Sequence, residues 1–99
     1  MLESSKLNAR MERTMPSSNT KRTPIEIFAE ILDLCKQPTA RTHVMYKTNM
    51  SYSNMLNSLE HLQKLQMLKF DKNSKKYETT EKGHEYVKKY YELERILRL

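Results

Sequence analysis

Ninety-nine residues, of which 37% are hydrophobic, can form one small domain with a single core, but they cannot also enclose a large active-site cavity. The 18 lysine and arginine residues outnumber the 12 aspartate and glutamate residues, so the net charge is +6 and a polyanionic partner is favoured over an acidic small substrate. One cysteine and three scattered histidines exclude an internal disulfide and offer no spacing for metal ligands.

The sequence lacks the signals of a membrane protein and of an enzyme. No hydrophobic run approaches the ~20 residues that a membrane-spanning helix needs, and the amino terminus has no compact apolar segment typical of a secretory signal. A single glycine rules out a glycine-rich phosphate loop, and neither a nucleophile elbow nor a pair of carboxylates in a predicted cleft is recognisable. We therefore expect a soluble cytoplasmic protein that is not an enzyme, needs no cofactor and has no membrane or small-molecule partner.

Residues 1–22 combine basic side chains with a stretch rich in serine, asparagine and threonine at 14–20. Such a composition tends to stay disordered, because its small apolar surface does not offset the entropy lost on ordering. We expect a flexible basic arm, although Leu7 and Met11 are spaced to pair on one helical turn.

The first predicted helix begins at a clear capping signal and ends before Pro38. Thr23 is the expected N-cap, Pro24 suits the first turn, and Glu26 completes a capping box. The helix stops ahead of Pro38 because proline disfavours helical geometry in the residue before it. Its expected buried stripe contains Ile25, Phe28, Ile31, Leu32 and Cys35. On this stripe the cysteine is expected to be a buried packing thiol rather than half of an intersubunit disulfide.

Two short helices joined by a tight turn follow. Thr39 is the expected cap of a helix at about 39–46 that leaves Arg41 outward. We expect its buried face to contain some of Ala40, Val44, Met45 and Tyr46. Residues 47–49 form the turn, and the next helix begins after Met50 and runs to about Lys64. This arrangement predicts a helix-turn-helix.

The second helix of the pair has an apolar face and a polar face. Ser51 is its expected N-cap, and its inward positions are Met55, Leu59 and Leu62. The polar face carries Ser53, Asn54, Asn57, Ser58 and His61. Small and amide side chains suit the base edges in the major groove of DNA, because they match donor and acceptor patterns without binding phosphate strongly.

The predicted base-reading residues are Ser53, Asn54, Asn57 and Ser58. Asn54 and Asn57 are the stronger candidates, since an amide can pair with adenine through two hydrogen bonds, whereas the two serines also suit phosphate or sugar. The alternative is a solvated face of an interaction domain, because serine and asparagine are common at protein surfaces.

A β-hairpin follows, predicted by alternating apolar and polar residues at 67–71 and 75–79 around turn residues 72–74. Its lysine-rich tip suits contact with phosphates, although charged residues on a hairpin also prevent aggregation. The predicted contacts to the DNA backbone are Arg41, Lys47, Ser51, Tyr52, Lys72, Asn73, Lys75 and Lys76. For Arg41 and Lys47 the alternative is a surface ion pair, and for Tyr52 it is packing on the preceding helix.

The last predicted helix opens at residues 80–83 and continues to the end of the chain. Gly83 is expected to lie where this helix contacts the body of the domain, since its missing side chain permits close packing. Intervals of four, three and four residues place Tyr86, Tyr90, Leu93 and Leu97 on one seam, as in a coiled coil. A helix that outruns so small a domain needs a partner for such a seam, and a homodimer is therefore predicted.

Three strings along the chain resemble one family. They are Arg41-Thr42-His43-Val44-Met45-Tyr46, Asn49-Met50-Ser51-Tyr52 and Tyr77-Glu78-Thr79-Thr80-Glu81-Lys82-Gly83. With the order of the helices and the hairpin, they resemble small archaeal winged-helix proteins of the chromatin type, which bind DNA and dimerise through a carboxy-terminal antiparallel coiled coil. Similar small winged-helix regulators occur in archaeal viruses and plasmids. The resemblance, over residues 23 to about 97, implies that the polar helix enters the major groove and that the hairpin, or wing, touches the adjacent backbone.

Together these features predict a mainly α fold with a small β-hairpin, namely a winged helix-turn-helix with a long C-terminal dimerisation helix. The expected parts are the arm at 1–22, the DNA-binding domain at 23–80 and the dimerisation helix at 81–99. The leading functional hypothesis is a homodimer that binds double-stranded DNA sequence-specifically and regulates transcription. The alternatives are an architectural, chromatin-type DNA-binding protein with little sequence preference and a protein-interaction adaptor on the same scaffold.

Overall fold

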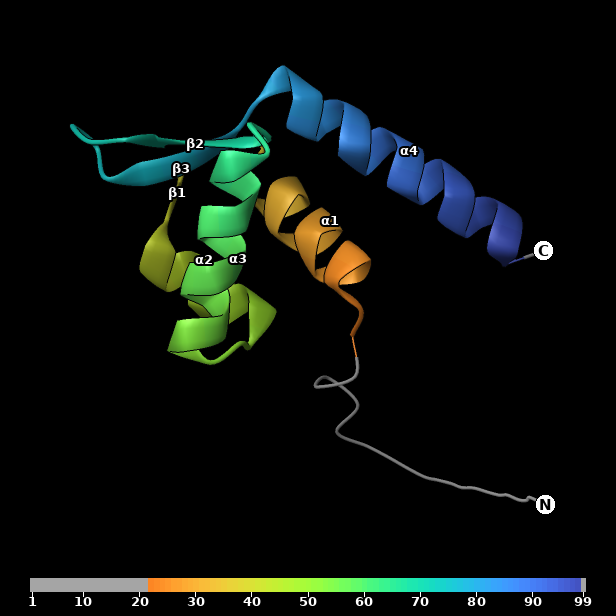
Figure 1. Cartoon of the computed structure of the whole chain (residues 1–99), viewed down its shortest axis with the longest axis horizontal. Coiled ribbons are helices and arrows are strands. Elements are labelled where there is room, and N and C mark those ends of the chain that lie inside the picture. The colour runs from red at the N-terminus through yellow and green to blue at the C-terminus, as the bar shows by residue number, and fades with distance from the viewer. Residues whose placement is uncertain (1–21, 99) are drawn as a thin grey trace, which may run out of the picture.

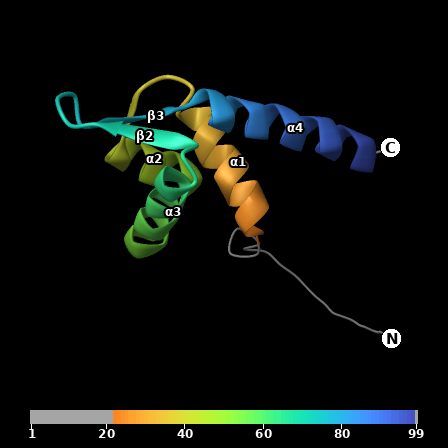
Figure 2. The ribbon, with the colours of Figure 1, turned by 45° about the horizontal axis from the view of Figure 1, so that its top comes forward.

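Four helices pack around a small sheet in the computed structural model, which describes residues 22–98. The elements are α1 (Pro24–Leu34), β1 (Thr39–Ala40), α2 (Arg41–Thr48), α3 (Tyr52–Lys64), β2 (Leu68–Asp71), β3 (Lys76–Thr79) and α4 (Glu81–Leu97). α1 lies between α3 and α4, and the hairpin of β2 and β3 projects away from the far end of α4 (Figure 1, Figure 2). The predicted mainly α fold with a β-hairpin is confirmed, and the sheet has a third strand that was not expected.

The predicted arm falls almost entirely on residues 1–21, which lie outside the described residues. Its last residue, Arg22, forms an ion pair with Glu30 of α1 and donates a hydrogen bond to the carbonyl oxygen of Thr48 (2.7 Å). The chain therefore enters the described structure beside the end of α2.

The start of α1 follows the prediction. Thr23 Oγ1 accepts a hydrogen bond from the backbone N–H of Glu26 (3.2 Å), and the Glu26 carboxylate accepts one from the N–H of Thr23 (2.9 Å). Among the expected stripe residues, the fully buried ones are Ile31, Leu32 and Cys35. The prediction for Ile25 is wrong, because its side chain is 59% exposed and lines an open cleft with Leu93 and Leu97 of α4.

The segment after α1 is a strand rather than a helix cap. Thr39 pairs with Tyr77 and Ala40 with Lys76, which adds β1 to the hairpin in the order β1-β3-β2. The Thr39 hydroxyl donates to the carbonyl oxygens of Leu34 and Gln37 (3.2 and 2.7 Å), and Thr39 lies one residue before the N-cap position of α2. The prediction of Thr39 as an N-cap is therefore wrong. Ala40 takes that position, and no side-chain hydrogen bond caps the helix.

α2 runs to Thr48, so Lys47 and Thr48 belong to its last turn rather than to the connection. Asn49 reverses the chain in the left-handed conformation (φ 56°), which asparagine tolerates better than most residues. Of the residues expected to supply the buried face of α2, Val44 is fully buried, whereas Tyr46 is 80% exposed.

α3 and the wing follow the predictions closely. Ser51 Oγ accepts a hydrogen bond from the N–H of Asn54 (3.3 Å), and α3 ends at the expected Lys64. Its three expected inward residues, Met55, Leu59 and Leu62, are buried. In the wing, Phe70 faces Tyr77 across the two strands, and their rings lie 4.7 Å apart.

Gly83 lies where α4 meets the sheet, as expected. A Cβ atom at this position would lie 2.4 Å from the carbonyl oxygen of Met67, so only glycine lets the helix approach so closely. α4 then packs along α1, and the Tyr86 hydroxyl donates to the carbonyl oxygen of Ile25 (2.8 Å). Within residues 22–98, none of the helices has the length and hydropathy needed to cross a bilayer.

Candidate nucleic-acid interface

The polar face of α3 is open to solvent. Ser53, Asn57, Glu60 and Lys64 recur at intervals of four, three and four residues, which places them on one line opposite the buried side of the helix. All four side chains are exposed. We call this line the outer stripe. It combines a hydroxyl, an amide, a carboxylate and an ammonium group on one accessible surface.

The predicted base-reading residues do not all lie on the outer stripe. Asn54 and Ser58 line a cleft of about 300 Å³ between α1 and α3, which Asn57 also borders. Ser58 is half-buried there, while Asn54 is exposed. His61 lies on the same edge of α3, with its ring edge-on to Phe28 at a centroid distance of 5.2 Å. Ser53 and Asn57 are therefore the more outward members of the predicted set.

Arg41 joins the first turns of α2 and α3. Its guanidinium donates a hydrogen bond from Nη1 to the hydroxyl oxygen of Tyr52 (2.8 Å). This hydrogen bond, together with the nearby phenol of Tyr77, raises the pKa of Arg41, which is charged at all physiological pH values. Both side chains keep donors for a further partner, because the Tyr52 hydroxyl accepts from Arg41 and its own proton points elsewhere. Tyr52 thus contacts α2 through its hydroxyl while its ring stays exposed.

The start of α2 adds backbone donors to this surface. No side chain caps α2, and the dipole of the helix favours an anion at this end. Ala40, which precedes the helix, pairs with Lys76 of the wing, and Lys76 also borders a concave surface with His43. The first turn of α3, the start of α2 and the start of β3 in the wing are therefore contiguous. Lys47 lies at the other end of α2, in its last turn, and Ser51 is the N-cap of α3.

The tip of the wing is built around Asp71. Its carboxylate accepts hydrogen bonds from the N–H of Asn73 and from the hydroxyl of Ser74, both at 3.0 Å, and these bonds lower the pKa of Asp71. Lys75 takes the left-handed conformation (φ 60°) that closes the turn. The Asp71 carboxylate is thus hydrogen-bonded within the turn, and the lysines of the turn are exposed.

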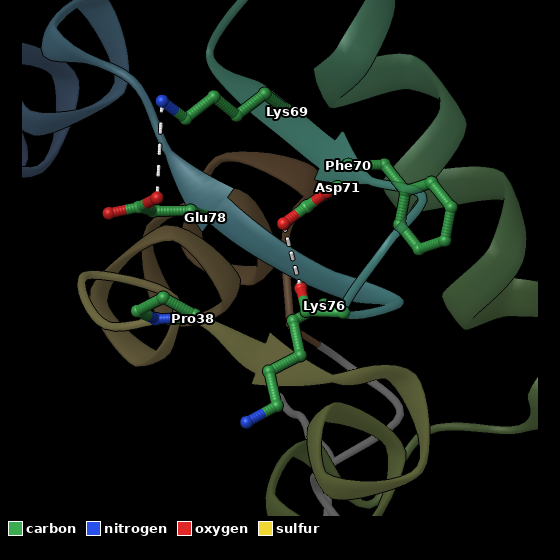
Figure 3. Close-up of a pocket in the computed structure, with 7 residues that line it drawn as sticks. Pro38, Lys69, Phe70, Asp71, Lys76 and Glu78 are labelled. Atoms are coloured by element: carbon green, nitrogen blue, oxygen red, sulfur yellow. Dashed lines mark hydrogen bonds and ion pairs between the residues drawn. The ribbon is translucent and has the colours of Figure 1, made fainter.

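The wing lysines differ in whether they form an ion pair. Lys69 lies 3.9 Å from Glu78 on the neighbouring strand, and Figure 3 shows this pair beside a cleft of about 290 Å³. Opposite charges alternate there, so this cleft is a poor site for an anion. In the described part of the chain, no ion pair involves the three other wing lysines, Lys72, Lys75 and Lys76. All three are exposed.

The predicted dimer residues lie in two settings. Tyr86 and Tyr90 are half-buried, and the Tyr86 hydroxyl donates a hydrogen bond to the carbonyl oxygen of Ile25 in α1. Leu93 and Leu97 are 55% and 75% exposed and border, with Ile25, a mostly apolar cleft of about 260 Å³. Among the described residues, no group of three histidine, cysteine, aspartate or glutamate side chains is arranged to hold a metal ion.

Two exposed residues of the outer stripe, Glu60 and Lys64, were not among the predicted site residues. They follow Asn57 by three and seven residues, which places them on the same face of α3.

Comparison with known proteins agrees with this architecture. A family model described as winged helix-turn-helix matches residues 21–98, which is most of the chain. None of the curated proteins compared matches it. The family match indicates DNA as the partner, in agreement with the lysine-tipped wing and the exposed polar face of α3. With its tri-helical head, three-stranded sheet and wing, the chain belongs to the winged helix-turn-helix family.

Proposed function

We propose that this protein is a sequence-specific, double-stranded DNA-binding regulator of transcription that acts inside the cell as a homodimer. One observation carries the proposal. The exposed hydrogen-bonding groups of α3 are contiguous with the Arg41 and Tyr52 pair and with wing lysines that have no ion-pair partner in the described chain. Such a surface has separate means of reading bases and of binding phosphates.

In the proposed complex, α3 lies in the major groove with Ser53 and Asn57 toward the base edges. Asn54 and Ser58 flank them on the side of α1. Arg41 and Tyr52 donate to a phosphate at one wall of the groove, and Lys47 at the end of α2 and Ser51 at the N-cap of α3 also contact the DNA backbone. Lys72, Asn73, Lys75 and Lys76 of the wing reach the neighbouring backbone. The phosphate contacts set affinity and salt dependence, whereas the amide groups set sequence preference.

The proposed dimer forms through the last turns of α4. Leu93 and Leu97 have little cover from their own chain, and Ile25 widens the apolar surface beside them. Burying the two leucines of each protomer stabilises a dimer by roughly 4–8 kcal/mol, which is of the same order as the free-energy cost of association. We therefore expect a dimer whose population depends on protein concentration. Tyr86 and Tyr90 support this surface from the side of α1.

The dimer is tested by light scattering across micromolar concentrations. Wild-type protein should approach twice the monomer mass, and Leu93→Asp combined with Leu97→Asp should remain monomeric while keeping its helical circular dichroism. Lys88→Asp, an exposed change on the same helix, is the control and should dimerise normally. A wild-type mass that stays monomeric throughout would exclude the dimer.

DNA binding is tested by fluorescence anisotropy with a pool of random duplexes, followed by sequencing of the bound fraction. Enrichment of one motif supports the regulator, and Asn57→Ala should weaken selection at one position by roughly tenfold, since an amide pair with adenine contributes discrimination of that order. Gln37→Ala, outside α3, should leave selection unchanged. Salt-sensitive binding without enrichment would instead indicate the architectural protein, and no binding at low salt would leave the adaptor.

A further inference from the structure

Glu60 is a carboxylate at the centre of the outer stripe of α3. It lies three residues after Asn57 and four before Lys64, on the side of the helix opposite the core. Its side chain is exposed, and within residues 22–98 it makes no side-chain hydrogen bond or ion pair, even with Lys64 one turn away. Both carboxylate oxygens are therefore free to accept hydrogen bonds from a ligand.

A carboxylate on a surface that meets DNA is unfavourable unless a donor compensates for it. Phosphates repel it, and so do the acceptors that guanine and thymine present in the major groove. Adenine offers an amino group, but the acceptor N7 lies beside it and faces the second carboxylate oxygen. Cytosine offers its N4 amino group next to an apolar C5–H edge, so it alone supplies a donor without an adjacent acceptor.

We propose that Glu60 is a specificity-determining residue that selects a cytosine in each half-site, next to the base pair read by Asn57. Three residues of an α-helix advance roughly 4.5 Å along its axis, a little more than the ~3.4 Å between successive base pairs. The amide and the carboxylate therefore suit neighbouring steps, and the preferred half-site pairs an adenine with an adjacent cytosine.

This inference rests on the proposed docking of α3 in the major groove, and it adds a consequence for affinity. Glu60 weakens binding to every sequence that lacks the cytosine, so it increases discrimination by penalising the alternatives. Removing the charge while keeping the shape should therefore strengthen binding to random DNA as it weakens selection.

The test is selection from a random duplex pool with wild-type protein, Glu60→Gln and Glu92→Gln. Glu92 is an exposed glutamate of α4, and α1 lies between that helix and α3 (Figure 1). Its substitution therefore makes the same change in net charge on an element outside the proposed interface. Wild-type protein should favour cytosine over other bases at one position by roughly tenfold. Glu60→Gln should lose most of that preference, shift it toward adenine and bind the unselected pool several-fold more tightly, whereas Glu92→Gln should do neither.

The outcomes separate this inference from the proposed function. A wild-type motif with a cytosine position that only Glu60→Gln abolishes supports the inference. A wild-type motif that Glu60→Gln leaves unchanged overturns the role of Glu60 while the regulator stands, and it shows that this glutamate is an ordinary solvated side chain. Binding by wild-type protein without any enrichment overturns both proposals.

Discussion

Replacing Gly83 with alanine changes the free energy of unfolding through two effects of opposite sign. In a helix alanine is more favourable than glycine by about 1 kcal/mol, so an open site would be stabilised by the change. At this site, however, the new Cβ would lie 2.4 Å from the carbonyl oxygen of Met67 and 2.5 Å from Cγ2 of Thr79. The first of these distances is shorter by about 1 Å than the ~3.3 Å of a close carbon–oxygen contact.

Neither neighbour of Gly83 is free to retreat. The Met67 carbonyl accepts a hydrogen bond from the N–H of Thr80 (3.0 Å), and the Thr79 hydroxyl donates to the carbonyl oxygen of Leu32 (2.7 Å). Overpacking of this kind costs about 1–3 kcal/mol, and two held neighbours place Gly83→Ala near the upper end of that range. Subtracting the roughly 1 kcal/mol by which alanine favours the helix leaves a net destabilisation of about 2 kcal/mol. This loss lowers Tm by roughly 8–16 °C in a domain of this size.

The assay is urea and thermal unfolding followed by circular dichroism. His84→Ala, an exposed change at the next position of the same helix, is the control and should be neutral or slightly stabilising. If Gly83→Ala raises Tm as much as the control does, the Cβ atom fits, and the contact of α4 with Met67 and Thr79 is not as close as the 2.4 and 2.5 Å distances require.

Three further predictions concern the wing and the core. Lys72→Glu combined with Lys76→Glu removes two proposed phosphate contacts, so the slope of log Kobs against log salt should become shallower by roughly 1.8 per protomer for every duplex sequence, while Lys88→Glu leaves it unchanged. Thr79→Val deprives the buried Leu32 carbonyl of its hydrogen bond and should cost about 1–3 kcal/mol in urea unfolding; a neutral result would contradict that role. Burial raises the pKa of Cys35 to about 11, so the folded state holds the thiol proton more tightly than the unfolded state does. Stability should therefore fall as pH rises from about 9 to 11, and a thiol reagent at pH 8 should label Cys35 only after unfolding, with rapid native labelling as the opposing result.

Local signals explain why so much of the fold was predictable. Thr23 and Ser51 cap their helices through hydrogen bonds to residues three positions away, and Thr80 does the same for α4 through the N–H of Gly83 (3.2 Å). Such contacts depend on neighbours in sequence, so the sequence displays them. The alternation of side chains in the wing is equally local, and the pairing of Phe70 with Tyr77 follows from it.

Features set by distant partners were not predictable in this way. β1 has two residues, too few for a periodic signal, and it is a strand only because β3 lies beside it. Thr39 has the residue type of an N-cap, but its pairing with Tyr77 places it in β1, one residue before the N-cap position of α2. Ile25 and Tyr46 lie on helices whose periodicity marks a buried face, yet periodicity does not reveal where the neighbouring elements end.

The candidate site shows the same division. Periodicity predicted the polar face of α3, but no local pattern indicates that Arg41 and Tyr52 hydrogen-bond to each other or that α2 begins without a side-chain cap. Both depend on how the two helices pack. Helical spacing alone could have predicted that Glu60 lies on the outer stripe with Asn57. Its residue type does not indicate base contact as readily, because a carboxylate accepts hydrogen bonds only, whereas an amide both donates and accepts.

An interface formed by α3 and the wing should make binding to duplex DNA strongly dependent on salt. Five proposed phosphate contacts per protomer come from basic side chains, namely Arg41, Lys47, Lys72, Lys75 and Lys76. Fluorescence anisotropy titrations at several salt concentrations should therefore give a slope of log Kobs against log salt of roughly −4 to −5 per protomer. No binding at low salt, or binding whose affinity does not change with salt, would contradict an interface formed by α3 and the wing.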